Sequence, residues 1–128
     1  GVEGIDALVA RARESGLAVD SAVEGQPRPV APTIGLTAYR VTQEALTNVV
    51  RHARAASAAV VLRYDPAAII VEVLDDGNGA RGGPVRPGHG LVGMRERVAA
   101  VGGSLDAGPL PGRGFRVRAC LPTTANAR

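Results

Sequence analysis

Residues 71–98 read VEVLDDGNGARGGPVRPGHGLVGMRERV, and the transitions within this stretch decide the fold. An apolar, strand-like run ends in Asp75 and Asp76, and a helical pattern opens at about residue 90. Residues 77–93, which join the two, hold seven of the seventeen glycines in the chain. Glycine lets the main chain approach a ligand closely, and a helix start offers N–H groups to an anion. The stretch therefore predicts a ligand site between a strand end and a helix start.

Two segments of this stretch match the dinucleotide-binding pattern Gly-x-Gly-x-x-Gly, but neither has the context that a Rossmann domain requires. GNGARG (77–82) comes after a strand without opening a helix, because Gly83, Pro84 and Pro87 interrupt the chain beyond it. GHGLVG (88–93) opens a helix, but PVRP precedes it in place of a strand. The sequence therefore argues against a Rossmann domain.

Helical and strand-like patterns cover most of the remaining chain. Strands are expected at 17–23, 58–64, 67–74, 104–108 and 114–122, and helices at 3–15, 33–55 and 90–101, with Thr33 as a cap. This order is not the strict alternation of a doubly wound parallel sheet. The predicted fold class is α/β (α+β), a two-layer sandwich in which helices cover one face of a mixed sheet. Residues 1–128 are expected to form one domain with a loose tail at 123–128.

The cations are all arginine: fifteen arginines and no lysine give a net charge of +3. The absence of lysine excludes a Schiff-base lysine and the phosphate-binding loop that ends in Gly-Lys-Ser/Thr. The only aromatic residues are Tyr39, Tyr64 and Phe115, which argues against nucleic-acid binding by stacking on aromatic platforms. A basic nucleic-acid binder is therefore the weakest functional class, since the arginines are also dispersed.

The cysteine content and the hydropathy pattern exclude further classes of protein. Cys120 has no intrachain partner and is expected to be a small buried hydrophobe, and no zinc-like ligand spacing is present. No apolar run approaches the length of a membrane span. These patterns predict a soluble, intracellular protein. Because the chain begins at Gly1 and Met94 is its only methionine, we expect it to be a piece of a longer protein.

The long helix at 33–55 carries two different faces. At helical spacing, one stripe is polar and comprises Glu44, Asn48, Arg51 and His52, while the face expected to pack on the sheet comprises Thr42, Leu46, Val49, Val50 and Ala53. Taken alone, the polar stripe fits a solvated helix surface. A carboxylate and an amide oxygen one turn apart also suit Mg²⁺, and an arginine and a histidine on the next turn suit phosphate.

Four segments together resemble a known superfamily. QEALTNVVRHA (43–53), DDGNG (75–79), GHGLVGMRERV (88–98) and GRGFRVRACLP (112–122) are similar to the N, G1, G2 and terminal boxes of the GHKL ATPases. Within that superfamily they resemble the ATP-binding domain of bacterial sensor histidine kinases of the NarL/DesK-like type. The resemblance implies the Bergerat fold, with ATP between the long helix, the sheet end and a flexible lid at residues 80–89. The last box departs from the family, because Gly114-Phe115 replaces the common Gly-Thr.

The resemblance also implies roles for individual residues. Asp75 would accept a hydrogen bond from the adenine amine, with Gly77 and Gly79 beside the base. Asn48 would ligate Mg²⁺, and Glu44 would act catalytically by ordering a magnesium-bound water. The phosphate contacts would come from Arg51, His52, Gly88, His89, Gly90, Leu91 and Gly93.

The resemblance implies partners as well. No phosphoacceptor histidine is recognisable, so the acceptor would lie on an upstream dimerisation and phosphotransfer domain, with a response regulator of the helix-turn-helix type receiving the phosphoryl group. This domain would be a cytoplasmic monomer that itself touches neither membrane nor nucleic acid, whether or not the parent sensor is membrane-bound. Two alternatives stay open: a stand-alone serine kinase of the anti-sigma-factor type, and a nucleotide-sensing module without catalysis.

Overall fold

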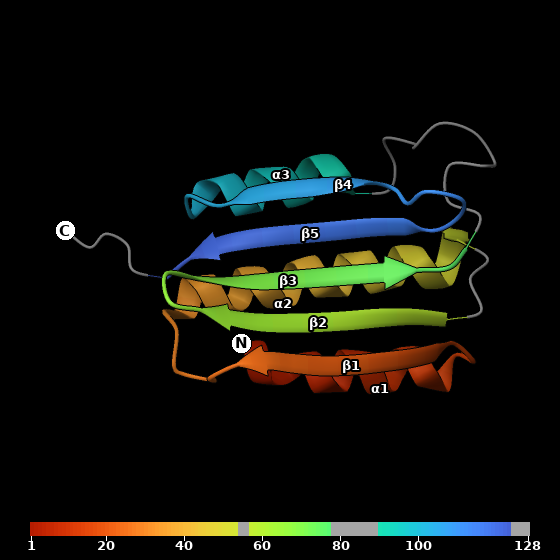
Figure 1. Ribbon diagram of the computed structural model, residues 1–128, viewed down its shortest axis with the longest axis horizontal. Helices are drawn as coiled ribbons and strands as arrows, with labels where there is room; N and C mark the ends of the chain where they lie inside the picture. The colour runs from red at the N-terminus through yellow and green to blue at the C-terminus, as the bar shows by residue number, and fades with distance from the viewer. Residues whose placement is uncertain (54–56, 78–89, 124–128) are drawn as a thin grey trace.

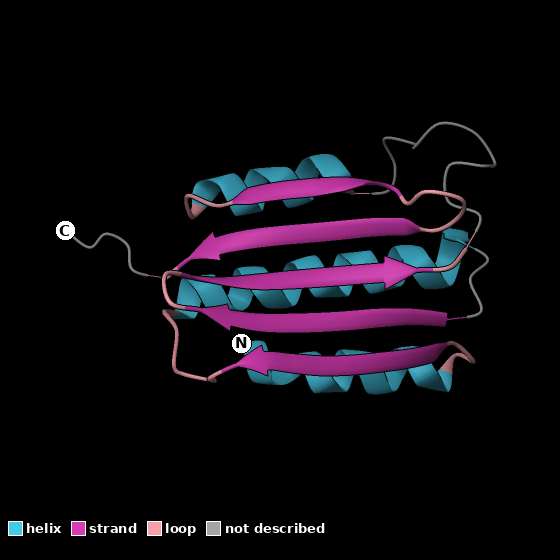
Figure 2. Cartoon of the chain, viewed as in Figure 1, coloured by secondary structure: helices cyan, strands magenta, loops and turns pink. Residues whose placement is uncertain are grey.

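The computed structural model describes residues 1–53, 57–77 and 90–123. Figure 1 shows the arrangement of the elements, and Figure 2 shows the same view coloured by secondary structure. The helical elements are η1 (Val2–Gly4), α1 (Ile5–Glu14), α2 (Pro32–Asn48), η2 (Val49–Ala53) and α3 (Leu91–Ala100). The strands are β1 (Ala18–Gly25), β2 (Ser57–Asp65), β3 (Ala68–Asp75), β4 (Ser104–Pro109) and β5 (Phe115–Pro122).

The five strands form one mixed sheet in the order β1-β2-β3-β5-β4. β1 and β2 are parallel, whereas β2–β3, β3–β5 and β5–β4 are antiparallel. All three α-helices lie on the same face of the sheet, and the other face is open (Figures 1 and 2). The predicted two-layer α/β sandwich is therefore confirmed.

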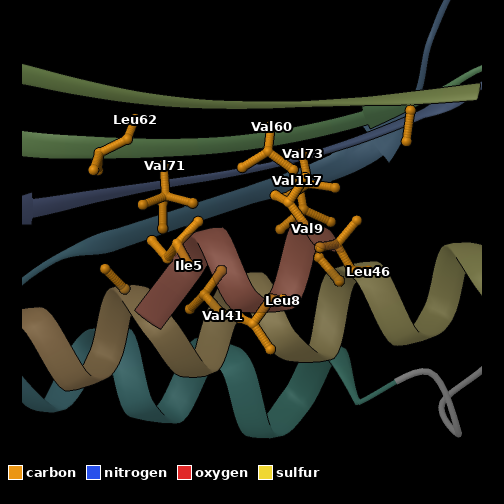
Figure 3. Close-up of a cluster of buried hydrophobic side chains, with 14 of the residues drawn as sticks. Ile5, Leu8, Val9, Val41, Leu46, Val60, Leu62, Val71, Val73 and Val117 are labelled. Carbon is orange, nitrogen blue, oxygen red and sulfur yellow. The ribbon is translucent and has the colours of Figure 1, made fainter. Parts of the chain in front are cut away.

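The core lies between the sheet and the helices, as the close-up in Figure 3 shows. It contains little except aliphatic side chains, and Ile69, Val71, Met94, Val98 and Leu121 are essentially inaccessible to solvent. Alternation places every second residue of β3 and β5 in this core. The edge strand β1 differs, because only Val19 is buried and Val23 is 56% exposed. The expectation of a half-buried strand is wrong over the second half of β1.

The start of the long helix is one residue earlier than predicted, and its cap is different. α2 begins at Pro32 with Ala31 at the N-cap, and no side chain hydrogen-bonds to the cap. The prediction of Thr33 as the capping residue is therefore wrong. Proline suits the first helical position because its fixed φ is already helical and its missing N–H would have no partner in the helix there.

The end of the long helix is wider than an α-helix. Residues Val49–Ala53 form a π-helical turn, in which the repeat exceeds 3.6 residues. Thr42, Leu46 and Val49 are buried as predicted, but Val50 is 46% exposed. The prediction that Val50 packs on the sheet is wrong, because the buried face of α2 is centred on Val41, Ala45 and Val49, and helical spacing places Val50 well to one side of it.

Four chain segments meet at one end of the sandwich, the end at which β3 finishes. β3 ends there, β5 begins there, α2 reaches it through η2, and α3 starts there (Figure 1). In the sequence, the glycine-rich stretch lies between β3 and α3. Among the described residues, no helix is both long enough and apolar enough to cross a bilayer.

Candidate functional site

Asp75 is the last residue of β3 and is one of few buried polar residues, with an exposed fraction of 8%. It occupies the position at which the alternation of Ile69, Val71 and Val73 would place another apolar side chain. Its Oδ1 accepts a hydrogen bond from the Gly77 N–H at 2.7 Å. Burial raises the pKa of Asp75, the Asp76 charge adds to the rise, and the Gly77 hydrogen bond opposes both. A buried carboxylate at a strand end is available to a ligand that donates a hydrogen bond.

Asp76, the next residue, has a structural role. Its carboxylate accepts hydrogen bonds from the Ser57 N–H at 3.0 Å and from Ser57 Oγ at 2.8 Å. Its own N–H donates to the Ser57 carbonyl, and its carbonyl accepts from Arg113 Nε at 2.8 Å. Asp76 therefore joins the start of β2, the end of β3 and the β4–β5 turn, which fixes the main chain next to Asp75.

The β4–β5 turn approaches Asp75 from the other side. Gly114 has a φ of +103°, and a Cβ at this position would collide with the Asp75 carbonyl oxygen. Glycine is required there for both reasons. Phe115 is the next residue and is the direct cross-strand partner of Asp75 in the antiparallel β3–β5 ladder. Neither contact is apparent from local sequence, because the two segments lie forty residues apart.

Glu44 reaches the start of α3. Gly90 is the N-cap of α3 with a φ of +76°, and a Cβ added there would lie 2.6 Å from Oε2 of Glu44. The Glu44 carboxylate therefore packs directly on the glycine that opens α3, where the helix dipole favours negative charge. Leu91 begins α3 and packs against the core, and a Cβ at Gly93 would come no closer than 3.8 Å to Arg97.

The remaining predicted residues on the long helix do not all face the same side. Asn48 is half-buried at the end of α2, one turn from Glu44. Arg51 is exposed and lines a groove of about 220 Å³ between α1 and α2, together with Thr47 and Val50. The structure therefore places Arg51 at the groove between α1 and α2, whereas Glu44 contacts Gly90 at the start of α3. Its phosphate role stays a prediction without support from this geometry.

Several predicted residues lie outside what the structure describes. Gly79, Gly88 and His89, and the predicted lid at 80–89, fall in the undescribed segment 78–89. His52 belongs to η2, but its side chain is likewise outside the described set.

The donor set for a metal is small. In the described part of the chain, no three His, Cys, Asp or Glu side chains gather into a possible metal cage. Glu44 and Asn48 offer one carboxylate and one amide oxygen on adjacent turns of α2. Mg²⁺ commonly takes one or two protein oxygens and completes its shell with water and substrate phosphates. The residues present fit a magnesium ion that arrives with a phosphate ligand.

The arrangement as a whole defines a class of protein: a Bergerat-type α/β sandwich with a buried acid at the strand end and an acid-bearing long helix facing a glycine-opened helix. Residues 34–125 match the family of histidine kinase-, DNA gyrase B- and HSP90-like ATPases. The chain belongs to this family, and the resemblance of its four boxes to the GHKL ATPases is confirmed, while the NarL/DesK-like type stays a prediction.

Two curated proteins to which this chain is similar are histidine kinases. The sensor histidine kinase YxjM of Bacillus subtilis is 41% identical over 91 residues, which is 71% of this chain and 22% of that protein. The signal transduction histidine-protein kinase/phosphatase UhpB of Salmonella typhimurium is 39% identical over 87 residues, 68% of this chain and 17% of that protein. The chain therefore spans about a fifth of the length of these relatives.

A solved structure supports the fold. The histidine kinase domain of the blue-light activated histidine kinase from Erythrobacter litoralis superposes with a TM-score of 0.67, covering 94% of this chain and 63% of that one. At 23% identity the likeness establishes the fold alone.

Proposed function

We propose that this chain is the ATP-binding catalytic domain of a two-component sensor histidine kinase. It would bind ATP with Mg²⁺ and donate the γ-phosphoryl group to a histidine on a separate dimerisation domain. The observation that carries the proposal is the buried carboxylate of Asp75 at the end of β3, in a chain of the histidine kinase-like ATPase family.

Asp75 suits adenine for a chemical reason. A carboxylate accepts a hydrogen bond from the exocyclic amine of adenine, whereas guanine presents a carbonyl oxygen there, which the carboxylate repels. The buried Gly77 has no Cβ, so the main chain beside Asp75 leaves room for the ring edge. Gly79 has the same role in the proposal.

The triphosphate would lie between α2 and the start of α3. Asn48 would hold Mg²⁺ through its amide oxygen, and Glu44 would order a water bound to the metal. The N–H groups at the α3 start, from Gly90, Leu91 and Gly93, favour an anion, and Gly88 and His89 precede them. Arg51 and His52 are kept as further phosphate contacts only on the ground of the resemblance.

The transfer step is a displacement at phosphorus. The unprotonated imidazole nitrogen would attack the γ-phosphorus, the bond from the γ-phosphorus to the bridging oxygen would break, ADP would leave, and the proton on the other imidazole nitrogen would pass to solvent. The metal, when bound, neutralises charge on the phosphates. The protein contributes positioning and electrostatics, with Glu44 held in place against Gly90.

Partners and location are proposed from the sensor kinase relatives. The phosphoacceptor would lie on an upstream dimerisation domain of the same protein, and a response regulator of the helix-turn-helix type would receive the phosphoryl group. We propose that the isolated domain is a cytoplasmic monomer that contacts neither membrane nor nucleic acid.

Two other functions share the nucleotide site. A serine kinase of the anti-sigma-factor type would phosphorylate a serine on a partner, and a nucleotide-sensing module would bind ATP without transferring phosphate. The similarity to sensor kinases over 71% of the chain favours the histidine kinase. Offering the domain an isolated histidine-bearing dimerisation domain of a sensor kinase separates the histidine kinase from the other two functions, because only the histidine kinase labels it.

The direct test is a calorimetric titration of ATP and of GTP, each with and without Mg²⁺. We expect ATP to bind and GTP to bind far more weakly, with ATP affinity dependent on Mg²⁺. The domain alone should incorporate little or no phosphate from labelled ATP. Equal affinity for the two nucleotides would remove Asp75 from the base pocket, and self-labelling at the rate of an intact kinase would place the acceptor within this chain.

A further inference from the structure

Phe115 is the only phenylalanine in the chain and stands at the first position of β5. It is paired with Asp75 across the β3–β5 ladder and with Pro109 across the β4–β5 ladder. It therefore lies beside the buried acid at the edge where β3 ends and β5 begins (Figure 1).

The register fixes the direction of its side chain. Residues directly opposite each other in an antiparallel pair project from the same face of the sheet, with Cβ atoms about 5 Å apart. Asp75 projects toward the helices, because it continues the buried alternation of β3. Phe115 projects toward the helices too, in line with the buried Val117 and Leu121 of β5.

Its burial differs from that of its neighbours on the same face. Val117 is 5% exposed and Leu121 is inaccessible, whereas Phe115 is only half-buried and packs against the rim of the core. An aromatic ring that served the core alone would be enclosed like the two aliphatic side chains. Part of this ring is therefore accessible to solvent at the end of the sheet where Asp75 lies.

The main chain on both sides of Phe115 is fixed. Gly114 contacts the Asp75 carbonyl, and the Leu110 N–H donates to the Gly114 carbonyl at 2.9 Å. Arg113 Nε is bonded to the Asp76 carbonyl. The main chain that carries the ring thus has a fixed position relative to Asp75, which is what a wall of a binding pocket requires.

We propose that Phe115 forms an apolar wall of the base pocket. It contacts the purine ring whose exocyclic amine donates a hydrogen bond to Asp75. This inference rests on the proposed nucleotide site and adds a residue to it. The phenyl ring has no hydrogen-bonding group, so it leaves the Asp75 carboxylate to the base and contributes dispersion and exclusion of water.

A magnetic resonance experiment tests the contact without altering the protein. Because Phe115 is the only phenylalanine, a perdeuterated domain with protonated phenylalanine gives ring signals from one residue. We expect cross-relaxation between these ring protons and the adenine H2 or H8 of bound ATP–Mg²⁺. Saturating ATP without any such transfer would overturn the inference.

Substitution gives an energetic test. We expect Phe115→Ala to weaken ATP binding about 10-fold, the effect typical of losing one aromatic contact with a base. Binding of inorganic tripolyphosphate with Mg²⁺ should be unchanged, because it has no base. Phe115→Leu keeps apolar volume in the core and should show a smaller loss for ATP.

Tyr64→Leu is the matched control. Tyr64 is also a half-buried aromatic residue packed against the core, but it lies at the opposite end of β2 from the site. It should lose some thermal stability without losing ATP affinity. Unchanged or tighter ATP binding by Phe115→Ala would overturn the inference while leaving the nucleotide site intact, provided that wild type binds ATP and Asp75→Asn weakens it. A wild-type domain that binds no ATP would instead remove the proposed function.

Discussion

The acids on the open face of the sheet and the acids near the end of β3 have opposite surroundings. On the open face, Arg116 lies 2.9 Å from Asp106 and 3.6 Å from Glu72, so these charges are neutralised within the protein. Near the end of β3, Asp75 and Glu44 take part in no ion pair within the described part of the chain. The acids paired with arginine support the sheet, whereas Asp75 and Glu44 keep their carboxylates for the ligand in the proposed nucleotide site.

Asp75→Asn should have the largest effect on function. The amide keeps an acceptor for the Gly77 N–H but loses the charge offered to the adenine amine. We expect ATP affinity to fall about 10- to 100-fold, the ~1.5–3 kcal/mol of a charge-assisted hydrogen bond. Calorimetry measures the loss, and unchanged affinity would show that the edge acid does not meet the base.

The same substitution should not destabilise the fold at neutral pH. The pKa of Asp75 is raised by burial, so the folded state holds its proton more tightly than the unfolded state. The stabilising contribution is present below the ordinary carboxyl pKa and is lost as pH rises through the raised value. As the pH rises through this acidic range, the free energy of unfolding of the wild type should therefore fall relative to that of Asp75→Asn. A difference that rises with pH would contradict the assignment.

Gly90→Ala tests the second unbalanced acid. The added methyl group would press on the Glu44 carboxylate and would hold a non-glycine residue at a φ of +76°. We expect a loss of about 1–3 kcal/mol in the free energy of unfolding. Combining Gly90→Ala with Glu44→Ala should restore only the part of the lost stability that comes from the contact between the added methyl group and the Glu44 carboxylate. Gly93→Ala is the control: its added methyl group would make only an ordinary contact with the Arg97 side chain at 3.8 Å, and its position is helical, so it should be neutral or stabilising. Equal losses for the two alanines would refute a specific contact at Gly90.

The elements that have local signals in the sequence could be predicted from it. The alternation through Val71 and Val73 predicted β3 and a strand end at the two acids, and the four boxes predicted the fold. The π-helical turn at Val49–Ala53 was missed, because extrapolation of a regular helix assumes a constant repeat. Val50 was assigned to the buried face because the sequence pattern did not show that this face is centred on Val41 and Ala45. The pairing of Asp75 with Phe115 was also missed, because strand register between distant segments is set by the assembled sheet.

Asp76→Ala separates the two neighbouring acids. It removes both acceptors of Ser57, and we expect a loss of about 1–3 kcal/mol in stability because the Ser57 N–H loses its partner. Asp76→Asn retains one acceptor and should lose less. ATP affinity measured below the melting transition should change far less than in Asp75→Asn. A comparable loss of affinity would mean that the two acids form one site.

Arg116→Ala should have the smallest effect, although it removes two ion pairs. Its partners on the open face are partly solvated, with 73% of the Asp106 side chain exposed, so water screens the interaction. We expect a loss of about 0.2–1 kcal/mol in the free energy of unfolding, reduced further by salt, and no change in ATP affinity. Denaturant titrations at low and high salt measure it, with Arg40→Ala on the exposed side of α2 as a control for removing an arginine. A larger, salt-independent loss would show that the open face depends on Arg116 packing over the sheet, and the contrast between the two sets of acids would then rest on the edge alone.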